Sequence, residues 1–187
     1  MRRTGFTLIE LLVTLAVAAL LLSLALPSFD ALIGRQRSAA ALNRMVATVH
    51  FARSLAITSG QTVTLCPARS GECLGRNEWH QGAMVFVDPN ANGRLDGDET
   101  AERTLPALER GERIYWRSFR NRSYLQFGPR GYTRWQNGSF LYCPPSRQAD
   151  LARAVILNAQ GRLRPARDRD GDSVVEDAEG EPVVCPP

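Results

Sequence analysis

The sequence contains no lysine, and all 23 of its positively charged residues are arginine. The absence of lysine excludes the phosphate-binding loop G-x-x-x-x-G-K, which needs a lysine near its end. Histidine is scarce too: His50 falls in a helical pattern and His80 follows Trp79 in a turn, neither beside an evident nucleophile. No cysteine pair has the C-x2-C spacing typical of zinc sites. We therefore expect neither an enzyme nor a bound cofactor.

What the chain does contain is enough apolar sequence for a core. Of its 187 residues 44% are hydrophobic, which suits one domain with an appendage. The net charge of +4 allows a weak general attraction to polyanions. Arginine offers phosphates a planar fork and stacks on aromatic rings, although a GC-rich genome would produce the same preference for arginine.

A long apolar run lies near the N-terminus, from Phe6 to Leu26, and reads FTLIELLVTLAVAALLLSLAL. As a helix it would be about 31 Å long, which matches the hydrocarbon core of a bilayer. Arg2 and Arg3 precede the run and should stay in the cytoplasm, so the rest of the chain would cross the membrane. We expect a transmembrane helix over residues 6–26. Its one charged residue, Glu10, is costly in a membrane and is a functional candidate for that reason.

The stretch RRTGFTLIELLV, residues 2–13, resembles the N-terminal signal of type IV pilins and pseudopilins. The resemblance implies a prepilin leader over residues 1–5, which a prepilin peptidase removes between Gly5 and Phe6 before methylating the new amine. It also implies that Glu10 of one subunit pairs with the amine of Phe6 in a neighbour. The alternative is a plain membrane anchor with a stray glutamate.

Beyond the apolar run, helical periodicity continues to about Ser59, and Gly60 is a suitable stop. We expect one long helix from Phe6 whose second part, residues 27–59, is amphipathic and packs on a head. The head, residues 60–187, is rich in short β-like runs separated by turns and ends in an acidic tail that we expect to be the least ordered part. The fold class is thus α+β, a long helix packed on an antiparallel sheet. The expected strands are Thr62–Cys66, Ala83–Asp88, Arg113–Phe119, Tyr124–Phe127, Ser139–Cys143, Ala154–Asn158 and Gly161–Arg164.

Several head segments narrow the resemblance to the GspH/FimT family of minor pilins and pseudopilins, over nearly the whole chain. The matching stretches are FARSLAITSG, LCPARSGEC, VFVDPNANGRLDGDE, FGPRGYTRWQNGSFLYC and VILNAQGRLR.

Four cysteines in a segment delivered to the periplasm indicate disulfides. Three pairings are open, together with free thiols. We favour Cys66–Cys73, which closes a short loop, and Cys143–Cys185, which would tie the tail to the sheet.

The segment DPNANGRLDGDE fits the twelve-residue calcium-loop pattern. Asp88, Asn90, Asn92, Asp96 and Glu99 supply the oxygens. However, no flanking helices are expected, and such sequences also form tight hairpin turns without metal. We favour the turn, with calcium as the weaker alternative and no metal as the main expectation.

Arginine gathers in two places. Eight arginines lie between Arg103 and Arg134, interleaved with Tyr115, Trp116, Phe119, Tyr124, Tyr132 and Trp135, a mixture that suits base stacking or, alternatively, a strand pair with its aromatic rings inward. The second place is Gly161-Arg162-Leu163-Arg164, which resembles the G-R-x-R motif of DNA-binding FimT-type proteins. By this resemblance Arg162 and Arg164 are DNA-binding candidates, and Arg167 is a third. The acidic tail nearby would oppose DNA unless the Cys143–Cys185 link holds it away.

The expected function is assembly. The resemblance implies a single-pass protein of the inner membrane with its head in the periplasm, which enters a type IV pilus or a type II secretion pseudopilus and primes or caps it. Its partners would be other pilins or pseudopilins, the prepilin peptidase, the membrane and, in one version, DNA taken up by the pilus. The alternative is a purely structural pseudopilin without a nucleic-acid role.

Overall fold

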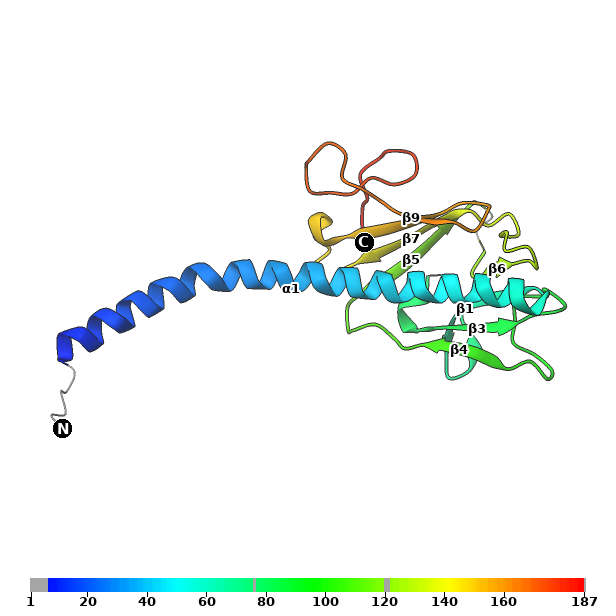
Figure 1. Cartoon of the computed structure of the whole chain (residues 1–187), viewed down its shortest axis with the longest axis horizontal. Helices are drawn as coiled ribbons and strands as arrows, with labels where there is room; N and C mark the ends of the chain where they lie inside the picture. The colour runs from blue at the N-terminus through cyan, green and yellow to red at the C-terminus, as the bar shows by residue number, and fades with distance from the viewer. Residues whose placement is uncertain (1–6, 76, 120–121, 187) are drawn as a thin grey trace. The chain divides into compact units, whose positions relative to one another are not determined.

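The computed structural model describes residues 7–75, 77–119 and 122–186, without the side chains of residues 24–28, 30 and 31. The chain divides into two compact units, Met1–Arg37, which we call the N-terminal segment, and Ser38–Pro187, the head unit. One helix, α1 (Leu8–Ser59), contributes to both (Figure 1). It ends at Gly60, whose φ of +66° is the left-handed conformation that favours glycine after a helix.

The first sheet of the head unit is antiparallel and is built around β1 (Val63–Arg69). Its order is β2 (Glu72–Cys73), β1, β3 (Ala83–Val87) and β4 (Ala101–Leu105), and β6 (Leu125–Phe127) pairs with the first residues of β1. A short 3-10 helix, η1 (Trp79–Gln81), precedes β3 and buries Trp79.

The second sheet is also antiparallel, in the order β5 (Arg113–Ser118), β7 (Gly138–Cys143), β8 (Arg153–Leu157) and β9 (Leu163–Pro165). A 3-10 turn, η2 (Ala149–Leu151), connects β7 to β8. In β5 the side chains alternate: Ile114 and Trp116 are buried, whereas Arg113 and Arg117 are exposed. This period of two gives the sheet one face for the core and one outer face.

The main core is enclosed by the head part of α1 and both sheets (Figure 1). The helix contributes Ala41, Leu42, Met45, Val49, Ala52 and Ala56. These positions follow a helical period, so they form one stripe that faces the strands. Across from it lie large side chains such as Phe127, Phe140 and Tyr142. The predicted amphipathic helix thus supplies one wall of the core.

The outer face of each sheet is covered by an irregular segment that a disulfide helps to hold. Over β1 and β3, Leu95 packs with Met84 and Phe86 beside the Cys66–Cys73 link. Over β7 and β8, Val175 and Val183 of the tail pack near the Cys143–Cys185 link. The two disulfides are the pairs that the sequence favours. The tail also adopts defined turns, contrary to the expectation that it is the least ordered part, because its carboxylates accept backbone N–H bonds.

The expected strands occur within a few residues of their predicted bounds, but two strands were missed. β2 is only two residues long, and β4 is exposed along most of its length, so neither carries a hydrophobic pattern. The single expected sheet is in fact two. Within the described residues, no helical stretch combines the length and the hydropathy needed to cross a bilayer. The predicted span 6–26 includes residue 6 and the side chains of 24–26, which lie outside the described part, so it stays a prediction.

Candidate functional site

The start of α1 places Glu10 in the first turn of an exposed apolar helix. The backbone N–H of Glu10 donates a hydrogen bond to Thr7 Oγ1 at 3.3 Å, so Thr7 caps the helix. Around it, large apolar side chains from Leu8 to Leu22 are 52–77% exposed. A carboxylate at a helix N-terminus is favoured by the helix dipole. Gly5 and Phe6, the predicted processing site, lie outside the described residues.

The turn between β8 and β9 fixes the G-R-L-R sequence. Asn158 shapes it: its backbone carbonyl accepts the N–H of Gly161 at 3.0 Å, and its Oδ1 accepts the N–H of Arg162 at 2.9 Å. Gly161 has φ of +74°, and a Cβ there would lie 2.5 Å from the carbonyl oxygen of Gly131. Both facts require glycine at this position. The turn therefore rests directly on the segment that contains Gly131.

Arg162, Arg164 and Arg167 are all exposed, whereas Leu163 between the first two packs against the main core. The structure thus brings together the two arginines of the motif on the outside of the turn. Within the described part of the chain, none of the three lies within ion-pair distance of a carboxylate. Their guanidinium groups are available to an anion.

The acidic tail is not held away from Arg164. A groove of about 860 Å³ on the outer face of the second sheet is lined by Arg164, Asp177 and Glu179 together. The tail end is fixed by the Cys143–Cys185 disulfide and by Arg117, whose Nη2 donates to the carbonyl of Val184 at 3.2 Å. The disulfide therefore leaves two carboxylates on the face that carries Arg164.

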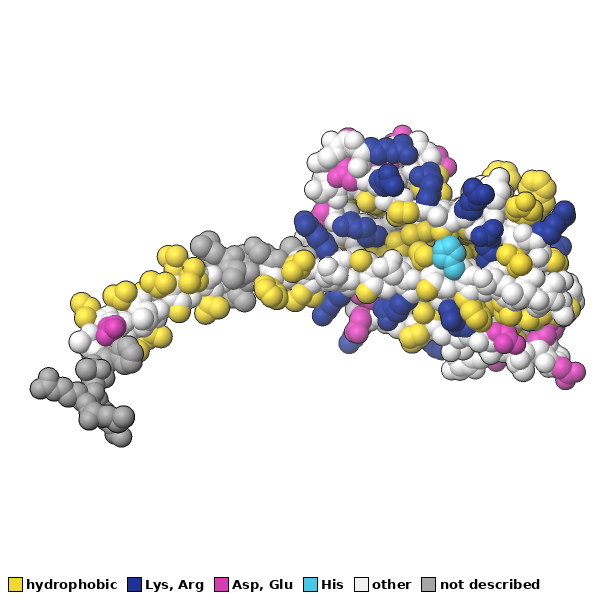
Figure 2. All heavy atoms as spheres, viewed as in Figure 1, with side chains coloured by type: hydrophobic (Ala, Val, Ile, Leu, Met, Phe, Trp, Pro, Cys, Tyr) yellow, Lys and Arg dark blue, Asp and Glu magenta, His cyan; other side chains and the backbone are white. Residues whose placement is uncertain are grey.

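In the arginine-rich segment from Arg103 to Arg134, some aromatic rings are packed inside the head and others are exposed. Trp116 is buried and packs on Phe140, with ring centroids 4.3 Å apart. By contrast, Phe119, Tyr132 and nearby Trp135 are 82%, 52% and 71% exposed. The expectation of inward rings holds for the strand and is wrong for the loops. Figure 2 shows dark blue arginine side chains gathered over the second sheet and the tail.

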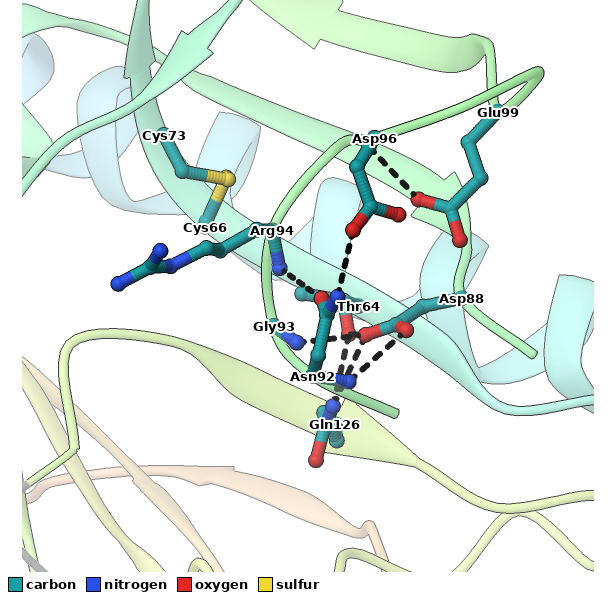
Figure 3. Close-up of a disulfide and its surroundings, with 10 residues drawn as sticks. All are labelled: Thr64, Cys66, Cys73, Asp88, Asn92, Gly93, Arg94, Asp96, Glu99 and Gln126. Carbon is teal, nitrogen blue, oxygen red and sulfur yellow. Dashed lines mark hydrogen bonds between the residues drawn. A yellow bond between two sulfur atoms is a disulfide. The ribbon is translucent and has the colours of Figure 1, made fainter. Parts of the chain in front are cut away.

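The candidate calcium loop is organised by a buried carboxylate, that of Asp88 (Figure 3). Its Oδ2 accepts hydrogen bonds from Thr64 Oγ1 at 2.5 Å, Gln126 Nε2 at 3.0 Å and the Gly93 N–H at 2.9 Å, and its Oδ1 accepts the Asn92 N–H at 3.1 Å. Asn92 also donates to Asp96 at 2.7 Å. These donors hold the loop in a tight turn around Asp88, and the calcium alternative stays a prediction.

Two ionisable groups near these loops have displaced pKa values. Burial raises the pKa of Glu99, and the charges of Asp88 and Asp96 add to this, against a hydrogen bond from the Asp96 N–H. Burial, followed by the charge of Arg113, lowers the pKa of His80, although Glu78 opposes the shift. Both shifts are accounted for by burial and neighbouring charges.

A second acidic group was missed by sequence reasoning. Asp168, Asp170 and Glu176 converge so that oxygens of all three lie within 4.8 Å of one another, the one such convergent group in the part of the chain that the structure describes. Such oxygens suit a hard cation. However, Asp168 accepts the N–H groups of Gly171 and Ser173, and Glu176 accepts that of Arg169, so the cluster shapes its own turn. The D-x-D-x-D spacing from Asp168 to Asp172 could have revealed it.

Comparison with known proteins agrees with this geometry. The family model described as type II transport protein GspH matches residues 41–161, and that of the prokaryotic N-terminal methylation motif matches residues 1–26. No curated protein sequence is similar enough to match the chain.

Solved structures are similar in fold. Two crystal forms of the type IV minor pilin FimU of Pseudomonas aeruginosa PAO1 are 18% identical, with TM-scores of 0.52 and 0.51 over 71% of this chain and 87% and 92% of theirs. The minor pseudopilin EpsH of the Vibrio cholerae type 2 secretion system is 13% identical, with a TM-score of 0.47 over 67% of this chain and 94% of its own. The FimU likeness shows that the head has a minor-pilin fold.

Proposed function

The chain belongs to the GspH family of type II transport proteins, and on that premise we propose that it is a minor pilin or pseudopilin assembled into a filament through its N-terminal helix. It acts by association with other subunits and not by turnover. In this proposal it waits in the inner membrane with its head in the periplasm, and then enters a type IV pilus or a type II secretion pseudopilus, at which it primes or caps assembly.

The observation that carries the proposal is the exposed apolar surface of the N-terminal segment. Large apolar side chains from Leu8 to Leu22 are each more than half exposed, with Glu10 as the one charged residue among the described residues 7–23. So much apolar surface is unfavourable in water and needs lipid or neighbouring helices around it. A membrane before assembly and a helical filament core afterwards both provide this.

Processing at Gly5 and Phe6 prepares the helix for assembly. In this proposal a prepilin peptidase cuts between them and leaves an amine on Phe6, which bears a positive charge in an apolar surrounding. Glu10 of a neighbouring subunit neutralises it, because opposite charges in a low-dielectric surrounding attract strongly. A bulky residue in place of Gly5 should block the cut, and mass spectrometry of the chain would then find no mature N-terminus at Phe6.

The assembly step is tested by replacing Glu10 with alanine. We expect normal membrane insertion and maturation but a strong loss of the protein from sheared filaments, because the neighbouring amine loses its counter-charge. Glu10→Asp, which keeps the charge on a shorter side chain, is the matched control and should retain part of the incorporation. Glu10→Ala protein at the normal level in sheared filaments would contradict the proposal.

Exposure of the G-R-L-R turn favours a second role, the non-specific binding of DNA. Arg162 and Arg164 lie on the outer side of the turn, and neither forms an ion pair with a carboxylate among the described residues. Arg167 follows on the same exposed stretch. Phosphate contacts of this kind are indifferent to sequence and weaken steeply with salt, because they release counterions. Asp177 and Glu179 in the neighbouring groove would reduce the affinity. The alternative remains a structural pseudopilin without this role.

This second role is tested with the full-length chain in detergent, titrated with duplex DNA at low salt. Arg162→Gln/Arg164→Gln should weaken binding and lower its salt dependence. Arg147→Gln is the control for removal of a positive charge. Arg147 is exposed in the turn after β7, which lies at the opposite end of the sheet from the turn between β8 and β9. Equal affinity of the wild type and the double variant for duplex DNA would show that the G-R-L-R turn is not the binding site.

A further inference from the structure

The loop between β6 and β7, residues 128–137, which we call the β6–β7 loop, lies directly beside the G-R-L-R turn. Thr133 donates its backbone N–H to the carbonyl of Ala159 at 3.0 Å, and its hydroxyl contacts the same oxygen at 3.2 Å. A Cβ at Gly161 would lie 2.5 Å from the carbonyl oxygen of Gly131, and a Cβ at Gly131 would lie 2.7 Å from Cδ1 of Ile57 on α1. The loop therefore holds its side chains in a fixed place next to Arg162 and Arg164.

One side of the β6–β7 loop forms a hollow of about 370 Å³ whose charged lining residues, among those described, are all arginines. Arg122, Arg130 and Arg134 line it together with Tyr132 and Trp135, and no carboxylate among the described residues does. Among the hollows lined by described residues, this one combines three arginines with two exposed aromatic rings. Its charge is complementary to an anion and its rings suit a flat apolar group.

Trp135 is held in this position by the residues around it. Its φ of +60° is a left-handed conformation that bulky residues rarely adopt. Next to it, Gln136 is buried, and its Oε1 accepts the backbone N–H of Gln126 at 2.6 Å. Arg134 donates its own N–H to the carbonyl of Gln126 at 3.2 Å. The loop is thus anchored on both sides of a ring that remains 71% exposed.

Trp135 also links this hollow to the larger groove on the second sheet. It lines both, and the groove adds the exposed ring of Phe119 and the guanidinium of Arg164. The hollow and the groove therefore meet at Trp135, and both contain arginines and exposed aromatic rings. Asp177 and Glu179 lie at the groove and not at the hollow, so the positive lining is strongest around the β6–β7 loop.

We propose that the β6–β7 loop makes this surface a binding site for single-stranded nucleic acid, in which Trp135 and Tyr132 stack on unpaired bases while Arg130 and Arg134 contact the phosphates. The proposal rests on the DNA-binding role suggested for the head and specifies its ligand. Side-chain rings reach base faces only where the bases are unpaired and unstacked. A duplex would use the arginines alone and leave Trp135 and Tyr132 without a partner.

The affinity test uses the full-length chain in detergent and the fluorescence anisotropy of labelled oligothymidylate of about 12 nucleotides, a length typical of small single-strand-binding folds. Trp135→Asn removes the ring and suits the left-handed backbone. It should lower the affinity for the single strand by roughly 5- to 100-fold. Affinity for duplex of the same length should change by less than about twofold, since phosphate contacts do not need the ring. Trp135→Phe should retain most of the single-strand affinity.

Tryptophan emission gives an independent readout. Trp79 and Trp116 are 1% and 5% exposed, so Trp135 is by far the most accessible of the three tryptophans. Oligothymidylate should quench its emission through stacking, whereas inorganic polyphosphate, which has no bases, should bind without quenching. Trp135 is exposed, so Trp135→Asn should keep the thermal unfolding of the wild type.

The outcomes separate this inference from the proposed function. Equal single-strand affinity for the wild type and Trp135→Asn, or no single-strand binding by the wild type, overturns the inference. So does polyphosphate that competes as well as oligothymidylate, because the surface would then select charge alone. If Arg162→Gln/Arg164→Gln leaves duplex binding unchanged while Trp135→Asn loses single-strand binding, the G-R-L-R role fails and the β6–β7 loop site stands.

Discussion

Both ends of α1 contain large apolar side chains, but these are exposed at one end and buried at the other. In the N-terminal segment, large apolar side chains from Leu8 to Leu22 are 52–77% exposed. In the head unit, Leu42, Met45 and Val49 of the same helix are 1–6% exposed. Apolar side chains thus stabilise the head at one end and remain exposed at the other, where we propose that they serve association. Substitutions should therefore separate stability from assembly along a single helix.

A large effect on the stability of the head should come from the disulfide that fixes its tail. Cys143→Ser/Cys185→Ser opens a link across 42 residues, and chain entropy predicts a loss of about 4 kcal/mol in the free energy of unfolding. Cys66→Ser/Cys73→Ser is the matched control, since it opens a link across only 7 residues and should cost about 2.5 kcal/mol. Urea unfolding of the full-length chain in detergent measures both. A larger loss for the short link would contradict the account.

The comparison itself is tested by the same substitution at both ends of the helix. Leu42→Ala leaves a cavity in the main core and should lower the free energy of unfolding by about 2–5 kcal/mol. Leu12, which is 58% exposed, should tolerate Leu12→Ala with a change below about 0.5 kcal/mol in head stability. Thermal and urea unfolding of the head signal give both values. Equal losses at the two positions would mean that the N-terminal segment also carries part of the folding energy.

Two carboxylates sharpen the contrast further. Asp88→Asn replaces an acceptor of hydrogen bonds from Thr64, Gly93 and Gln126 with a group that must also donate, and should cost the head about 2–3 kcal/mol. Glu10→Gln, at an exposed position outside the core, should leave head unfolding unchanged. In filament incorporation we expect the reverse. Glu10→Gln should reduce incorporation, whereas Asp88→Asn should affect it little. The same account predicts that calcium at millimolar concentration gives no binding heat at the Asp88 loop in isothermal titration.

The smallest expected effect is a pH dependence of the head. Burial, followed by the charge of Arg113, lowers the pKa of His80 in the folded state, so the unfolded chain binds this proton more readily. Stability should therefore be complete above the unfolded pKa of about 6.5 and decline as the pH falls through it. His80→Asn should flatten the profile between about pH 7.5 and 5.5. A stability that rises on acidification in this range would show that another group dominates.

Much of this architecture could be predicted from the sequence because the signals are local. Helical periodicity predicts the helix to Ser59 and its stop at Gly60, and short apolar and aromatic runs predict strands such as β5 and β7. The short loop between Cys66 and Cys73 favours the observed pairing. In each case the residues that specify the structure are close together in the chain.

The remainder depends on contacts between distant segments. β4 has no apolar pattern because it is an exposed edge strand, and it is held by pairing with β3. The division into two sheets depends on which strands pair with each other, and the periodicity of apolar residues does not specify this pairing. The exposure of Trp135 depends on its neighbour Gln136, which reaches Gln126 on β6. For the same reason, the sequence identified the G-R-L-R turn but not its contact with the β6–β7 loop.

The most direct test of the central claim, that the N-terminal segment serves association, is photo-cross-linking from position 12 in the bacterial membrane. Leu12 is 58% exposed, so a photoreactive residue there should form a covalent product with another pilin-like subunit, and Glu10→Ala should greatly reduce that product. The same probe at exposed Arg147 of the head is the matched control and should not depend on Glu10. A subunit product from position 12 that is lost with Glu10→Ala supports the account. Cross-links to lipid alone, or a subunit product unaffected by Glu10→Ala, would contradict it.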